Sequence, residues 1–265
     1  MKISVLTIFP EMFDGFLREP VIARAVSRGI ASIETVDIRR FAGGSFRHID
    51  DDTYGGGAGM VMRAQPILDA LKDVQKNAGR AEDMTQAAQG YVCVMTPAGR
   101  LYSQQTARRL AEKEHLILVC GHYEGMDERV MRHADEEISI GDYILTGGEL
   151  PAKVVMDSVI RLLDGVLRKE STQRESFEEG LLEYPQYTKP LIVEGEPVPE
   201  ALLTGDHQKT EAWRLRQSLM RTLRRRPDLL RRRGLSDEER HLLETEKLTD
   251  DERQLLQTIR EADRG

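Results

Sequence analysis

The sequence predicts an α/β protein with a mainly parallel sheet, followed by a small helical C-terminal part. Over the first 165 residues, short apolar runs alternate with helical patterns, which is typical of a parallel sheet covered by helices on both faces. A wholly polar segment at 168–176 then interrupts the pattern. The segment from Gly205 to Gly234 contains ten Lys or Arg residues and three acidic residues. Its net charge is therefore +7, in a chain whose overall net charge is −7.

Five apolar runs predict the strands of the sheet: Ile3–Phe9, Ser32–Ile38, Tyr91–Met95, Leu116–Cys120 and Glu136–Ile140. Apolar residues at helical spacing predict the helices: Phe13–Ser27, Pro66–Gln75, Ser103–Glu114, Asp127–His133 and Leu150–Leu163. The last helix has Pro151 near its first turn, a position where proline is favoured.

The composition bounds the class of protein. No apolar run reaches about 18 residues, so we expect no membrane span. A signal peptide is not predicted, because Pro10, Glu11 and Asp14 stand where small cleavage-site residues belong. Cys93 and Cys120 lie in apolar runs, which predicts two buried thiols in a reducing compartment rather than a disulfide framework. We therefore expect a cytoplasmic protein.

The basic segment indicates either a polyanion site or a solvated charged helix. Around Trp213, one helical face carries Ala212, Leu215, Leu219 and Leu223, and a different face carries Arg214, Arg221 and Arg225. The segment can therefore pack on a core and present arginines outward.

The C-terminal tail contains a repeat, LSDEERHLL at Leu235–Leu243 and LTDDERQLL at Leu248–Leu256. Each copy has a capping box, Ser236 with Glu239 and Thr249 with Glu252. The predicted organisation is an α/β domain at 1–167, a flexible linker at 168–176, a helical domain at 177–234 and a charged helical extension at 235–265 without a catalytic role.

Three glycine-bearing loops follow predicted strands: Thr96–Gly99, Gly121–Gly125 and Gly141–Glu149. Ligands in open α/β sheets bind beyond the carboxyl ends of the strands, so the loops predict one composite pocket or, alternatively, three ordinary turns. The run YGGGAGMVM at Tyr54–Met62 permits a close backbone approach to a ligand, but it lacks the Walker signature and equally suits a mobile surface loop. The histidine and cysteine spacings predict no metal cluster.

These blocks together resemble the bacterial tRNA (guanine-N1)-methyltransferase family. The resemblance is carried by MKISVLTIFPEMF, YGGGAGMVM, CGHYEGMDERV, IGDYILTGGELPA, SFEEGLLEYPQYTKP and VPEALLTGDHQKTEAWR, in this order from Met1 to about Leu230. It implies a SPOUT-type fold, whose α/β domain ends in a deep trefoil knot, and a homodimer with each active site shared between subunits. It also implies methylation of N1 of guanosine 37 in tRNA after guanosine 36, with S-adenosyl-L-methionine (AdoMet) as methyl donor.

The resemblance assigns cofactor binding to the three loops: Met95, Thr96, Pro97, Gly99, Gly121, Tyr123, Gly125, Ile140, Gly141, Asp142, Tyr143, Ile144, Leu145, Gly147 and Gly148. Glu124 matches a carboxylate near the methyl group, and it is a candidate for the Mg²⁺ requirement that the family implies. The residues assigned to the tRNA are Tyr54, Gly55, Gly56, Gly57, Gly59, Met60, His207, Arg214, Arg216 and Arg221.

The family's catalytic pair maps onto Arg161 and Glu175. Guanine N1 must lose a proton as it gains the methyl group, a task for a positioned carboxylate. An arginine near O6 stabilises the negative charge that develops there. The family has aspartate where this chain has Glu175, so the reach of the acid differs, and Glu178 or Glu179 are alternatives. Two other functions remain open: a ribose-methylating SPOUT enzyme, and a non-catalytic SPOUT protein that binds RNA.

Overall fold

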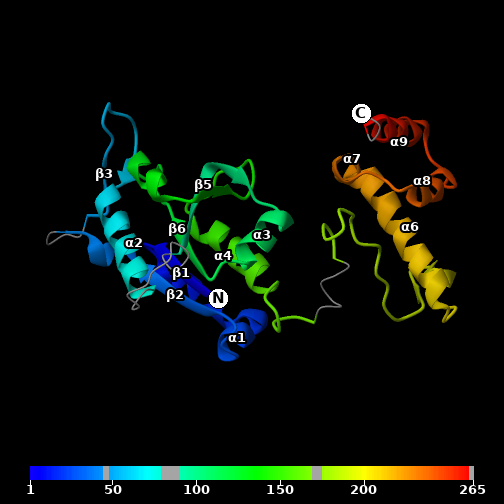
Figure 1. The fold of residues 1–265 in the computed structure, drawn as a ribbon, viewed down its shortest axis with the longest axis horizontal. Helices are drawn as coiled ribbons and strands as arrows, with labels where there is room; N and C mark the ends of the chain where they lie inside the picture. The colour runs from blue at the N-terminus through cyan, green and yellow to red at the C-terminus, as the bar shows by residue number, and fades with distance from the viewer. Residues whose placement is uncertain (44–47, 79–89, 169–174, 263–265) are drawn as a thin grey trace. The chain divides into compact units, whose positions relative to one another are not determined.

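The computed structural model describes residues 1–43, 48–78, 90–168 and 175–262, with the side chains of 260–262 excepted (Figure 1). The chain divides into two compact units, Met1–Arg168 and Lys169–Gly265. Most of the expected linker, 169–174, lies outside the described residues. Among the helices described, none is both long enough and apolar enough to cross a membrane.

The first unit is built on a five-stranded sheet in the order β2-β1-β6-β5-β7, in which every neighbouring pair is parallel. Its strands are β1 (Lys2–Thr7), β2 (Ser32–Asp37), β5 (Tyr91–Leu101), β6 (His115–Cys120) and β7 (Glu136–Ser139). The five apolar runs in the sequence correspond to these strands. A separate antiparallel hairpin joins β3 (Asp50–Asp52) to β4 (Met60–Met62).

Helices cover both faces of the sheet, because alternate strand residues point to opposite sides. One face packs on α1 (Pro20–Ser27), α3 (Gln104–Ala111) and α4 (Glu149–Ile160). The other face packs on α2 (Ala64–Ala78) and on the 3-10 helices η3 (Ile38–Phe41) and η5 (Glu128–His133). Leu116 and Leu118 of β6 thus contribute to the first core, and Ile117 and Val119 to the second.

Two helix predictions need correction. The stretch Phe13–Ser27 is divided into η1 (Pro10–Phe13), η2 (Phe16–Arg18) and α1, because Pro20 starts a new helix and Glu19 before it is extended, with ψ 135°. The segment Asp127–His133 forms the 3-10 helix η5, which Asp127 caps by accepting a hydrogen bond from the Arg129 N–H.

A buried histidine lies at the amino-terminal edge of this sheet. His115 is 5% exposed, and its Nε2 lies 2.8 Å from Ser4 Oγ, which in turn donates to Glu34 at 2.6 Å. Burial, and after it the positive charge of Lys2, lowers the pKa of His115 to about 4. The folded chain therefore keeps this imidazole neutral at a pH where the unfolded chain protonates it.

We expect this difference to reduce the stability of the protein as the pH falls from about 6.5 to about 4, by about 2–3 kcal/mol in the free energy of unfolding. The sign follows because the unfolded chain binds more protons in this window. Denaturant titrations at pH 7.5 and 4.5 check it, with His115→Gln as the comparison that does not titrate. A wild-type loss no greater than that of the variant would contradict the expectation.

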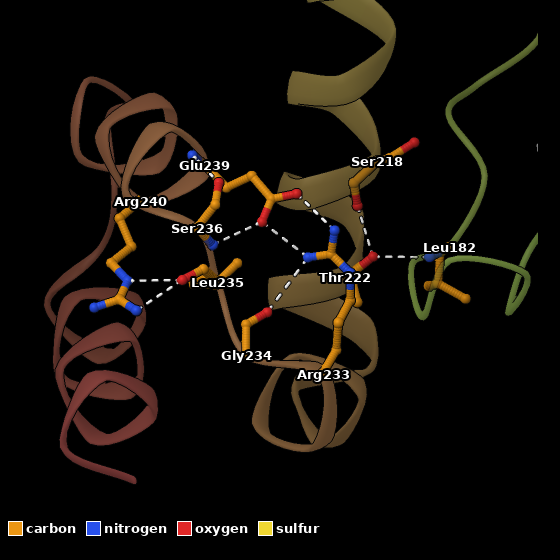
Figure 2. A network of polar contacts seen from close by, with 9 residues as sticks. All are labelled: Leu182, Ser218, Thr222, Arg233, Gly234, Leu235, Ser236, Glu239 and Arg240. Atoms are coloured by element: carbon orange, nitrogen blue, oxygen red, sulfur yellow. Dashed lines mark hydrogen bonds and ion pairs between the residues drawn. The ribbon is translucent and has the colours of Figure 1, made fainter. Parts of the chain in front are cut away.

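The second unit is mainly helical. After a loop segment that contains the short hairpin β8 (Ile192–Val193) and β9 (Glu196–Pro197) and the 3-10 helix η6 (Glu200–Leu202), it consists of α6 (His207–Arg225), α7 (Pro227–Arg233), α8 (Asp237–Glu244) and α9 (Asp250–Ala262). Asp206 caps α6 by accepting hydrogen bonds from the N–H groups of Gln208 and Lys209. Thr222 of α6 accepts a hydrogen bond from the Leu182 N–H at 2.9 Å, which ties the loop segment to the helix (Figure 2).

The tail is part of this unit's core rather than a charged appendage. Both capping boxes predicted at its two helix starts are present. Leucines of the repeat pack against the buried face of α6: Leu219, Leu223, Leu235, Leu243 and Leu256 belong to one cluster. On α6 itself, Leu219 and Leu223 of the predicted apolar face are buried and Leu215 is partly buried, but Ala212 is exposed.

Candidate functional site

The middle of β5 and the carboxyl ends of β6 and β7 surround a cavity of about 340 Å³. The loops beyond β6 and β7 form much of its wall, as expected for a composite pocket in a parallel sheet. The loop expected at Thr96–Gly99 is instead an irregular part of β5, which continues to Leu101 and shifts register against β7 between Met95 and Arg100. Thirteen of the fifteen expected cofactor residues line the cavity: Met95, Thr96, Pro97, Gly121, Tyr123, Gly125, Ile140, Gly141, Tyr143, Ile144, Leu145, Gly147 and Gly148. Glu124 lines it as well.

Gly99 and Asp142 are not in the cavity wall. A Cβ atom on Gly99 would lie 2.4 Å from the backbone N of Ile138, so this glycine permits β5 and β7 to approach each other. Asp142 is exposed. The wall also contains residues to which the sequence assigned no binding role: His122, Met126, Met131, Ile138, Ser139, Thr146 and Pro151. Those at 122, 126, 146 and 151 lie within the motifs that carry the resemblance, whereas Ile138 and Ser139 end β7 and Met131 lies in η5.

Gly148 fixes the loop before α4 against the end of β6. Its N–H donates to the carbonyl of Gly121 at 2.8 Å. A Cβ atom at this position would lie 2.8 Å from Cys120 Cα and 2.9 Å from Gly121 N, and both are backbone atoms that cannot move aside alone. The close approach of these two chain segments, which forms one side of the cavity, therefore requires glycine.

A buried carboxylate links the loop before α4 to the end of β1. Glu149, 2% exposed at the start of α4, accepts a hydrogen bond from Thr7 Oγ1 at 2.8 Å, and Thr7 ends β1. A Cβ atom on Gly147 would meet both Glu149 and His122, which shows how tightly the loop is enclosed. Sequence reasoning gave Glu149 no role, because a carboxylate in a glycine-rich loop is ordinarily exposed.

The glycine-rich loop before β4 packs on the Glu124 loop. The Glu124 N–H donates to the Met60 carbonyl at 3.1 Å, and the Met62 N–H donates to the Gly125 carbonyl at 2.9 Å. Gly59 lies directly against the Glu124 side chain, where a Cβ atom would be 2.4 Å from Cγ. The loop that carries Gly55, Gly56 and Gly57 is exposed, and Tyr54 at its start is fully exposed. This loop thus adjoins the cavity through Glu124.

Of the three residues expected to be catalytic, Glu124 lines the cavity, and the other two belong to different units. Arg161 ends α4 in the first unit, where its N–H donates to the Asp157 carbonyl at 3.2 Å. Glu175, in the second unit, lines a hollow of about 220 Å³. The alternative acid Glu179 lines the same hollow, together with Tyr184, Glu211 and Arg214. Glu178, the other alternative, donates its N–H to the Glu175 carbonyl at 3.2 Å.

The expected phosphate-binding arginines of α6 each contact a neighbour. Arg214 pairs with Glu211 at 2.8 Å and stacks over the Tyr184 ring at 4.9 Å. Arg216 pairs with Glu246, and Arg221 donates to the Glu183 carbonyl at 3.1 Å. His207 is exposed at the first residue of α6, and Trp213 is half-buried with its ring 6.2 Å from that of Tyr187.

The cysteines do not offer a nucleophile. Cys93 and Cys120 are buried and unpaired, and burial raises the pKa of both thiols. Among the residues that the structure describes, no group of three His, Cys, Asp or Glu side chains is placed to hold a metal ion.

Residues 1–232 match the family model of tRNA (guanine-1)-methyltransferase TrmD. The chain belongs to the TrmD family. It is 51% identical over 246 residues to the tRNA (guanine-N(1)-)-methyltransferase of Moorella thermoacetica, an alignment that covers 92% of this chain and 96% of the relative. Proteins of the same name from Halalkalibacterium halodurans and Staphylococcus haemolyticus are 49% and 46% identical, with 92% and 93% of this chain and 97% and 98% of the relatives covered. The TrmD match includes the cavity and Glu175, whereas α8 and α9 lie beyond it.

Proposed function

We propose that this chain transfers a methyl group from AdoMet to N1 of guanosine 37 in tRNA that has guanosine at position 36. Membership of the TrmD family supports the methylation of a tRNA guanine at N1. The observation that carries the proposal is the cavity at the middle of β5 and the ends of β6 and β7, where the three segments expected to bind AdoMet converge.

The cavity residues fit AdoMet by their chemistry. Backbone groups of the glycine-bearing loops suit hydrogen bonding to a neutral adenosine, and Met95, Ile138 and Leu145 add apolar surface. The carboxylate of Glu124 suits the positive charge of a sulfonium. AdoMet, when bound there, supplies an activated methyl group on that sulfonium. Gly99 and Asp142 would act indirectly, since neither lines the cavity.

In the proposed chemistry, Glu175 accepts the proton that leaves guanine N1. Arg161 stabilises the negative charge that develops on O6 as this proton departs. Glu124 also remains our candidate for a Mg²⁺ requirement, because a carboxylate oxygen is a ligand that Mg²⁺ prefers.

We further propose a SPOUT-type trefoil knot and a homodimer whose active site is shared between subunits. The knot would form where the chain from 140 to 160 packs against the end of β6, and the contact of Gly148 with Gly121 supports this. Exposed apolar side chains on this loop and on α4, namely Ile144, Leu150 and Val154, support a subunit interface next to the cavity. Cytoplasmic location is proposed from the tRNA substrate and the two unpaired thiols.

The second unit would bind the tRNA as a small helical domain. Its basic segment suits phosphates, and we propose Arg214 and Arg221 as contacts. Arg216 was expected in the same set, but its partner Glu246 is only 22% exposed, whereas Glu211, the partner of Arg214, is 45% exposed, so phosphate displaces Glu211 more readily. His207 at the start of α6 and the exposed loop Tyr54–Met60 would contact the substrate as well, the loop next to the target base.

Methyl incorporation from labelled AdoMet into tRNA transcripts tests the proposal. We expect incorporation into a transcript with guanosine at positions 36 and 37, and none when adenosine replaces guanosine 37. Mapping of the product should place the methyl group on N1. A 2′-O-methyl product would indicate the ribose-methylating alternative, and the absence of incorporation would indicate a non-catalytic RNA-binding protein.

A further inference from the structure

The tail beyond the family match, which comprises α8, α9 and the connection between them, supplies carboxylates to three arginines of the segment 205–234. The match ends at residue 232, and α8 and α9 follow it. Residues 235–265 contain ten acidic and five basic residues, a net charge of −5 beside a segment of net charge +7. Three ion pairs join the two parts: Arg216–Glu246, Arg224–Glu252 and Arg233–Glu239.

Two of the tail carboxylates in these ion pairs, Glu239 and Glu252, also accept hydrogen bonds from backbone N–H groups of the tail. Glu239 accepts two hydrogen bonds from Arg233, at 2.6 and 2.9 Å, and a third from the Ser236 N–H (Figure 2). The Glu252 side chain is only 15% exposed, although that of its partner Arg224 is 52% exposed. The hydrogen bond from the Thr249 N–H, and the one from Arg224, lower the pKa of Glu252, so this carboxylate is ionised near neutral pH.

Other arginines of the same segment lie outside the reach of the tail. Arg225 and Arg231 are exposed, and within the described part of the chain neither has a carboxylate partner. Arg225 and Arg221 line a hollow of about 300 Å³ together with Ser176, Leu182, Tyr184, Gln186 and one carboxylate, Glu183, so its two arginines exceed its one acid. Residues 224 and 225 point in directions about 100° apart because they are consecutive in a helix.

We propose that the tail carboxylates neutralise one set of arginines in the segment 205–234 and leave another set to bind RNA. Arg216, Arg224 and Arg233 are held by the tail, and RNA phosphate binds at the hollow of Arg221 and Arg225. The inference rests on the proposed function, because it takes RNA as the ligand. An arginine that already has a carboxylate adds no net charge, so it releases few counterions when RNA binds. The tail therefore limits non-specific RNA binding.

Arg224 and Arg225 provide a matched pair for the first test. The salt dependence of binding is the slope of the logarithm of the association constant against the logarithm of the salt concentration, which is negative. We expect Arg225→Gln to reduce the magnitude of this slope for an unmodified tRNA transcript by about 0.7–0.9. Arg224→Gln makes the same charge change one residue away and should leave the slope unchanged. The measurement is the dissociation constant of the full chain over a series of KCl concentrations. Equal slopes for the two variants would overturn the proposal.

The converse test removes a tail carboxylate. Glu252→Gln should leave Arg224 without its carboxylate. We then expect the magnitude of the salt slope to increase by about 0.7–0.9 and the affinity for polyuridylate to increase several-fold. Glu244→Gln is the control, because Glu244 is exposed on α8 and has no arginine partner in the described residues. The gain should disappear in the double variant Arg224→Gln, Glu252→Gln. If Glu244→Gln and Glu252→Gln have the same effect, net charge alone explains the result and the proposal falls.

These measurements are made without AdoMet, so they separate the two proposals. A chain that shows the predicted slopes but transfers no methyl group would refute the proposed function and support the division of the arginines into two sets. A chain that methylates tRNA but shows equal slopes for Arg224→Gln and Arg225→Gln would support the proposed function and refute this division. The comparison of these two variants leaves the tail intact, so it holds even if Glu252→Gln disturbs α9.

Discussion

Glu175→Gln is expected to slow methyl transfer to tRNA by about 10²–10⁴-fold and to leave the affinity for AdoMet unchanged. The substitution keeps the size of the side chain but removes the carboxylate that accepts the N1 proton. Single-turnover rates with saturating AdoMet and tRNA measure the effect on chemistry, and equilibrium binding of AdoMet provides the control for folding of the first unit.

Glu179→Gln is the matched variant for this prediction. Glu179 lines the same hollow as Glu175 and carries the same charge, so a general electrostatic effect would slow both variants alike. We expect Glu179→Gln to retain most of the wild-type rate. The reverse order of rates would assign the proton transfer to Glu179, and two near-wild-type rates would remove this hollow from the chemistry.

Gly148→Ala is expected to weaken AdoMet binding by about 5–150-fold. The added Cβ atom would lie 2.8 Å from Cys120 Cα and 2.9 Å from Gly121 N, so one wall of the cavity has to move. Overpacking of this kind costs about 1–3 kcal/mol, which corresponds to about 5–150-fold in affinity if the cavity bears the strain. Equilibrium dialysis with labelled AdoMet gives the dissociation constant.

Gly15→Ala is the control for this glycine. Gly15 has ordinary helical angles, with φ −67°, and a Cβ atom added there would meet no neighbouring atom within 4 Å. The same added methyl group should therefore leave AdoMet binding unchanged. Wild-type affinity in Gly148→Ala would mean that the loop before α4 does not shape the binding site.

The sheet was predictable from the sequence because its strands are buried on both faces. The runs at β1, β5 and β6 are largely apolar, and this pattern marks a parallel sheet between two helical layers. The helix divided at Pro20 was less predictable, since apolar periodicity continues through it while the proline fixes a new start.

The packing of the tail was not predictable from its charge. Four of the nine residues in each copy of its repeat are charged, and the three leucines in each copy are equally compatible with the inner face of a separate appendage. In the structure these leucines share one core with Leu219 and Leu223 of α6. Which surface an amphipathic helix covers depends on tertiary contacts, and hydrophobic periodicity contains no information about the partner.

The candidate site was predictable in its loops but not in every residue. A glycine signals a close approach, yet the sequence does not say what approaches: for Gly148 it is the end of β6 beside the cavity, and for Gly99 it is β7. The placing of Glu149 against Thr7, 142 residues apart in sequence, arises only from the topology of the sheet. The relation of Arg161 to Glu175 depends on a polar linker whose sequence sets no geometry.

The most direct test of the account is a calorimetric titration of the full chain with AdoMet and, separately, with its demethylated product S-adenosylhomocysteine. We predict saturable binding of both compounds at one site per chain. The absence of heat and of binding for either compound, in a folded preparation, would contradict the claim that the middle of β5 and the loops after β6 and β7 form a site for the methyl donor.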